Sequence, residues 1–139
     1  MDSRHDETQW SVINTNRQLS ALRQIEAAID HLNAGQFECA VTLALAAEDH
    51  LPRSDAPYLY KVLSDRVPED EMKMFNVLRN WLKHHIEPDE IEFSEFEVAV
   101  ALIRATSKFF ATYRKSSQKT EAFIAWCQAK GLLTNPNPG

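Results

Sequence analysis

Four polar residues that could act on a phosphate lie within six positions of one another. The stretch FNVLRNWLKHHIEPDE, residues 75–90, contains Arg79, Asn80, Lys83 and His84. A guanidinium can bind a phosphate through two parallel N–H donors. An imidazole that titrates near neutral pH can accept or donate a proton during catalysis. These residues could therefore hold a phosphate and move a proton beside it.

The spacing of these residues predicts that they share the polar side of an amphipathic helix. At about 100° per residue, the apolar residues occupy one broad arc and the polar residues the complementary arc. The apolar arc consists of Met74, Phe75, Val77, Leu78, Trp81 and Leu82, and the polar arc of Asn76, Arg79, Asn80 and Lys83, with His84 at its edge.

Two distances along this helix matter for any shared chemistry. Asn80 and His84 are four residues apart, so the amide can hydrogen-bond the imidazole and set which ring nitrogen is free. Arg79 and His84 are five apart and point about 140° away from each other on a straight helix. Long side chains, an unwound helix end or a second subunit would have to bring them to one ligand.

Simpler interpretations of the same residues stay open. Arg79, Asn80 and Lys83 could form a solvated helix face, and a histidine at a helix C-terminus is favoured by about 0.3 to 1 kcal/mol. His85 is expected to be a core or interface residue. A zinc site is disfavoured, because adjacent histidines on a helix point about 100° apart.

Other charged groups could support or oppose a phosphate site. Glu48, Asp49 and His50 could bring a carboxylate to it if their helix ends nearby. A group of basic residues could bind the RNA backbone or could simply keep the protein soluble; it comprises Arg104, Lys108, Arg114, Lys115 and Lys119. The acidic run between Glu87 and Glu97 would repel RNA unless it turns away.

The composition favours an all-α fold that would position these residues. The chain has 139 residues, 44% of them hydrophobic, with three glycines and six prolines. Few glycines leave little material for the tight turns of an all-β fold. We predict one up-and-down bundle of four to six helices, with its core over residues 16–131, an N-terminal arm over residues 1–15 and a fraying tail over residues 132–139.

Hydrophobic periodicity and capping signals give the element order. Helices are expected over about residues 16–34, 37–51, 54–66, 68–85, 94–115 and 120–131. The second is apolar on nearly all sides, so we expect it to be the most buried. Ser94 and Glu97 form a capping-box pattern. Trp10, Val12 and Ile13 either extend the first helix or form the arm.

Charge and cysteine content limit the class of protein. The net charge of −5 argues against non-specific coating of nucleic acid. Cys39 and Cys127 lie in apolar helical contexts without CxxC spacing, so both are expected to be buried thiols. The first ten residues have no apolar core typical of a signal peptide, and no apolar run is long enough to span a membrane. We expect a cytoplasmic protein without a membrane partner.

The arginine, asparagine and histidine pattern resembles a known family. Arg79, Asn80 and His84 match the RNxxxH form of the R-x(4-6)-H motif of HEPN domains, which are small helical bundles of bacterial toxins and defence ribonucleases. The stretch AIDHLNAGQFECAVTLALAAEDHL resembles the first helical hairpin of that family. The resemblance covers about residues 18–131. Ile86 stands where some members have a tyrosine two residues after the histidine.

The resemblance implies a metal-independent endoribonuclease whose site forms where two subunits meet. It assigns catalytic roles to Arg79, Asn80 and His84, with Lys83 and Asn76 binding substrate. It implies an RNA substrate, a homodimer, a toxin or defence role with a protein antitoxin as an expected partner, and neither a cofactor nor a metal. The alternative is a non-catalytic HEPN-like module that binds a nucleotide or a protein.

Overall fold

The computed structural model describes residues 9–52, 61–62 and 68–134, and within these ranges it is all-α. The predicted class, a bundle of four to six helices, is confirmed. The five helices are α1 (Arg17–Asn33), α2 (Phe37–His50), α3 (Pro68–Lys83), α4 (Glu95–Tyr113) and α5 (Gln118–Ala129). Two strands of two residues each, β1 (Lys61–Val62) and β2 (Leu133–Thr134), form a small antiparallel ribbon.

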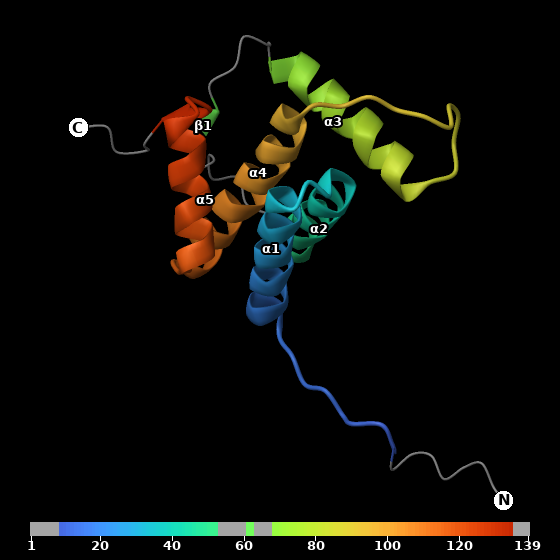
Figure 1. Cartoon of the computed structure of the whole chain (residues 1–139). Coiled ribbons are helices and arrows are strands. Elements are labelled where there is room, and N and C mark those ends of the chain that lie inside the picture. The colour runs from blue at the N-terminus through green and yellow to red at the C-terminus, as the bar shows by residue number, and fades with distance from the viewer. Residues whose placement is uncertain (1–8, 53–60, 63–67, 135–139) are drawn as a thin grey trace, which may run out of the picture.

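The first two helices form the predicted hairpin. Asn16 caps α1 by accepting a hydrogen bond from the backbone N–H of Leu19 at 2.8 Å. Gly35 adopts a left-handed φ of 77°, which a glycine accepts without steric cost, and α2 begins two residues later. Small residues such as Ala28 and Ala44 are fully buried, so α1 and α2 can pack closely side by side (Figure 1).

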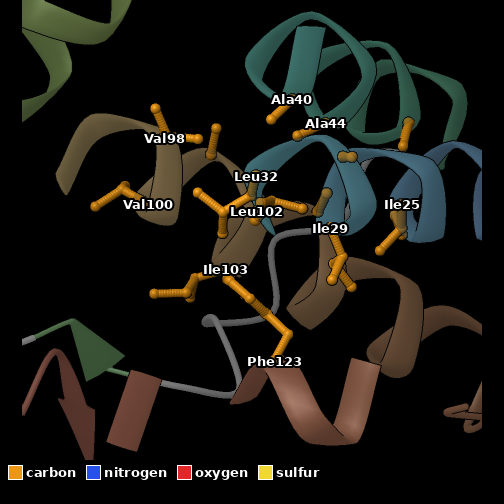
Figure 2. Close-up of a cluster of buried hydrophobic side chains, with 14 of the residues drawn as sticks. Ile25, Ile29, Leu32, Ala40, Ala44, Val98, Val100, Leu102, Ile103 and Phe123 are labelled. Carbon is orange, nitrogen blue, oxygen red and sulfur yellow. The ribbon is translucent and has the colours of Figure 1, made fainter. Parts of the chain in front are cut away.

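The most buried helix is α4, so the prediction that assigned this position to the second helix is wrong. Eleven residues of α4 are buried, against five in α2. Leu102 and Ile103 of α4 lie among Ile29 of α1, Ala44 of α2 and Phe123 of α5 (Figure 2). The residues of α2 that do not face this core, such as Thr42 and Ala46, are exposed.

The start of α4 differs from the predicted capping box. Ser94 is the N-cap residue, but its hydroxyl donates to the side-chain carboxylate of Glu97 and does not accept from the backbone. A capping box is present instead at α5, where Ser117 and Thr120 bond reciprocally. Between these helices Arg114 ends α4 with a left-handed φ of 55°.

The C-terminal tail is ordered farther than predicted. Leu133 is buried, and β2 pairs with β1 through Val62 opposite Leu133. The helix expected over residues 54–66 is wrong at Lys61–Val62, where the chain is a strand, and the rest of that segment lies outside the described residues.

The segment before α1 is an arm and not an extension of the helix. Residues 11–16 have no helix or strand and are all exposed. The arm leads away from the five helices (Figure 1). None of the described helices is both long and apolar enough to cross a membrane.

Candidate functional site

Helix α3 lies at the outer edge of the bundle (Figure 1) and holds all of the predicted site residues except His84, which follows its last residue, Lys83. Among its described side chains only Leu78 is fully buried, with 1% of its surface exposed, while Met74, Trp81 and Leu82 are half-buried. Val77 is exposed, although the sequence pattern placed it on the buried arc. Because α3 contacts the bundle along a narrow stripe, most of its polar arc stays accessible.

Arg79 is paired with the end of α2. Its Nη2 donates to Oδ2 of Asp49 at 2.5 Å, and both side chains are largely accessible to solvent. The other guanidinium nitrogens have no partner among the described residues. The prediction that α2 could bring a carboxylate to the site is therefore confirmed for Asp49.

The remaining predicted site residues lie at the surface. Asn76, Asn80, Lys83 and His84 are all exposed. Asn80 contacts His84 only through its backbone carbonyl, which accepts from the backbone N–H of His84 at 3.0 Å. The expected hydrogen bond between the Asn80 amide and the imidazole is absent from the described part of the chain.

The chain after α3 is fixed by a tryptophan. The indole Nε1 of Trp81 donates to the carbonyl oxygen of Pro88 at 2.7 Å, which holds the loop against the helix. His85 is exposed, so the prediction of a core position is wrong for the single chain. The loop carboxylates of Glu87, Asp89 and Glu90 are also exposed.

A pocket of about 400 Å³ lies between α1, α2 and α3. Helix α3 contributes Arg79, Leu82 and Lys83, and the other two helices contribute Gln24, Thr42, Leu45, Ala46, Asp49 and His50. The pocket lining thus combines apolar side chains with the positive charges of Arg79 and Lys83, and the negative charge of Asp49 offsets part of them. His84 is not among the lining residues, so one chain does not place both predicted catalytic groups at this pocket.

The most unusual group in the pocket is the side chain of Gln24. Its Oε1 is buried and has no hydrogen-bond partner among the described residues. A buried acceptor without a partner costs about 1 to 3 kcal/mol. No sequence signal marks Gln24, because one glutamine among the polar residues of α1 is ordinary.

Two of the basic residues proposed as an RNA track are structural. Arg104 donates from Nε and Nη2 to the two carboxylate oxygens of Glu48 at 3.2 and 2.8 Å. Lys108 donates to the backbone carbonyl of Glu48 at 3.2 Å. These contacts join α4 to α2, and Lys119 is paired with Asp30 of α1 at 2.7 Å, so the track hypothesis is left with Arg114 and Lys115.

The two cysteines differ in exposure. Cys127 is buried, and burial raises its pKa from 9.0 to about 12, which keeps the thiol protonated and unreactive. Cys39 is exposed, so the prediction of two buried thiols is wrong for this residue. Within the described ranges, no three His, Cys, Asp or Glu side chains are grouped in a way that could hold a metal ion.

Comparisons of the chain with family models, with curated proteins and with solved structures found no match.

Proposed function

We propose that the chain is a HEPN-like endoribonuclease that cuts single-stranded RNA without a metal ion, at a site completed by a second copy. The observation that supports this most directly is that two guanidinium nitrogens of Arg79 have no partner among the described residues, while His84, five residues farther along the chain, is exposed to solvent. A phosphate and a ribose can therefore reach both groups from outside the bundle.

The proposed chemistry assigns one role to each group. His84 takes the proton from a ribose 2′-OH, whose oxygen attacks the neighbouring phosphorus and expels the 5′ oxygen of the next nucleotide, and this leaving oxygen takes up a proton from water to become a hydroxyl. Arg79 binds the phosphate oxygens as negative charge accumulates on them. Asn80 donates to a phosphate oxygen, and the exposed Lys83 and Asn76 bind the flanking backbone.

We place the site at a contact between two copies because His84 follows the last residue of α3 and does not line the pocket that Arg79 borders. A two-fold arrangement of facing α3 helices would bring Arg79 of one protomer towards His84 of the other. The products would carry a 2′,3′-cyclic phosphate and a 5′-hydroxyl, and a 2′-deoxynucleotide at the cut position would block the reaction.

Cleavage of a labelled single-stranded RNA in the presence of EDTA tests this proposal. We expect His84→Ala to slow cleavage by about 100- to 10,000-fold, the usual contribution of a general acid or base. The matched control is His85→Ala, which removes an adjacent, equally exposed histidine and should cut at the wild-type rate. Equal loss in both variants, or no cleavage by the wild type, would reject the ribonuclease.

The second candidate function is a non-catalytic module that binds a nucleotide. It is favoured by the pocket, because Arg79 and Lys83 line it beside the apolar side chains of Leu45 and Leu82, whereas His84 does not line it. Titration with a nucleoside monophosphate separates the two candidates. Binding that Lys83→Ala weakens, without any RNA cleavage by the wild type, supports the module; cleavage that depends on His84 supports the ribonuclease.

A further inference from the structure

Cleavage of RNA by its own 2′ oxygen involves two proton transfers on opposite sides of the phosphate. One group takes the proton of the 2′-OH, and the departing 5′ oxygen gains a proton. A side chain placed to make one such transfer accelerates the reaction by about 100- to 10,000-fold. Because the attacking and leaving oxygens lie roughly in line with phosphorus, one imidazole does not serve both at once. An efficient site therefore contains a second titratable group beside the phosphate.

Among its described lining residues, the pocket between α1, α2 and α3 has one histidine, His50. This residue is half-buried in the last turn of α2 and lies one turn beyond Ala46 on the helix face that lines the pocket. Its imidazole has no hydrogen-bond partner among the described residues. Both ring nitrogens are therefore available to a ligand in the pocket.

Arg79 lies at the same end of this pocket as His50. Its Nη2 is bound to Oδ2 of Asp49 at 2.5 Å, and Asp49 directly precedes His50 in the chain. The ion pair thus holds the guanidinium beside the last turn of α2. The other two guanidinium nitrogens have no partner among the described residues, so a phosphate that binds to them would lie close to the imidazole of His50.

The charge and the size of the pocket suit a ligand that carries a phosphate. Arg79 and Lys83 contribute two positive charges and Asp49 one negative charge, so the described lining is positive before His50 is counted. The volume of about 400 Å³ is within the range of small-molecule sites in proteins. One phosphate with its ribose therefore fits between the arginine and the histidine.

We propose that His50 is the general acid of the ribonuclease and donates its ring proton to the departing 5′ oxygen in place of water. The inference rests on the ribonuclease function proposed above, in which His84 is the base. His84 takes the proton of the 2′-OH as the bond from the 2′ oxygen to phosphorus forms, and His50 releases a proton as the bond from phosphorus to the 5′ oxygen breaks. One proton is taken up and one is released, so the step balances. Because His84 does not line the pocket, the two imidazoles approach the phosphate from different sides, as an in-line displacement requires.

An RNA in which sulfur replaces the scissile 5′ oxygen distinguishes a general acid from a positioning residue. A thiol is far more acidic than an alcohol, so the sulfur leaves as a thiolate and needs no proton. We expect His50→Ala to cut ordinary RNA about 100- to 10,000-fold more slowly than the wild type, and to cut the sulfur-containing RNA at about the wild-type rate. His84→Ala should be slow on both substrates. His50→Gln keeps a polar side chain of similar length but releases no proton, so it should give the same pattern as His50→Ala.

His31→Ala is the matched control. His31 is also a half-buried histidine in the last turn of its helix, α1, but it does not line the pocket. This variant should cut both substrates at the wild-type rate.

Failure of this inference is distinguishable from failure of the ribonuclease. A wild type that cuts neither substrate would reject both proposals. Cleavage that depends on His84 but is unchanged in His50→Ala would reject only the role of His50. Equal loss on both substrates in the two His50 variants, or rescue by sulfur of His84→Ala instead, would also overturn the assignment of His50 as the acid.

Discussion

Replacing Asp49 with asparagine should strengthen the binding of single-stranded RNA. Asp49 is the one carboxylate that the described structure places against Arg79, with 2.5 Å between Oδ2 and Nη2. A phosphate bound to the opposite side of the guanidinium would lie about 7 Å from this carboxylate. The substitution removes the repulsion between the two anions and keeps a side chain of the same size.

The magnitude follows from the exposure of the pair. Arg79 and Asp49 expose 36% and 50% of their side chains, so solvent screens the interaction strongly. At an effective dielectric constant of about 40 to 80, two unit charges about 7 Å apart repel by about 0.6 to 1.2 kcal/mol. We therefore expect Asp49→Asn to lower the Kd for RNA about three- to eightfold, and to lower the free energy of unfolding by less than about 1 kcal/mol.

Fluorescence anisotropy with a labelled, non-cleavable 2′-deoxy-modified oligonucleotide measures this change. The titration is best done at about 0.05 M salt, because screening at higher ionic strength reduces the difference. Asp30→Asn is the matched control, since Asp30 also forms an exposed ion pair, with Lys119 on α5 at 2.7 Å. Both variants change the net charge equally. If they shift the Kd equally, or if Asp49→Asn binds no tighter than the wild type, a phosphate does not bind at Arg79.

Two further predictions concern the scaffold of the site. Leu78→Ala removes the one fully buried described side chain of α3 and should lower the free energy of unfolding by about 2 to 4 kcal/mol in urea denaturation. The control Lys73→Ala, on the exposed side of α3, should change this free energy by less than about 0.5 kcal/mol. Equal changes in the two variants would show that α3 is not docked through Leu78. In the folded protein at pH 8, Ellman's reagent should react with Cys39 alone, and with Cys127 only after unfolding. Burial raises the pKa of Cys127 to about 12. The contribution of this thiol to the free energy of unfolding is therefore complete below the unfolded pKa near 9.0 and decreases as the pH rises towards 12. A Cys127→Ala protein with the same alkaline stability profile as the wild type would contradict this.

The helix ends could be predicted from the sequence, because local capping and turn signals mark them. Asn16 and Gly35 mark the ends of α1 in the sequence as they do in the structure, because capping and left-handed turns depend on residue type. Burial depends on neighbours in space, which a helical period does not identify. For this reason α2 was expected at the centre that α4 occupies, and Cys39 was expected in the core.

The candidate site was predictable only in part, for a related reason. The period of α3 correctly placed Asn76, Asn80 and Lys83 at the surface. Asp49 could be suggested from its position at the end of a helix, but its contact with Arg79 depends on how α2 and α3 pack. Gln24 could not be identified at all, because its side-chain oxygen is unusual only in being buried without a partner among the described residues.

The arrangement of Arg79 and His84 makes the association state the central question about this protein. In a single chain each residue has a sufficient structural explanation, since Arg79 joins α3 to α2 and His84 ends an exposed helix. The pocket that Arg79 borders is not lined by His84, so a role that uses both groups on one phosphodiester depends on how far the chain after Lys83 can bring the imidazole or on a second copy. A dimer alone does not establish catalysis, however, because the ribonuclease further requires that facing α3 helices bring guanidinium and imidazole to one phosphate.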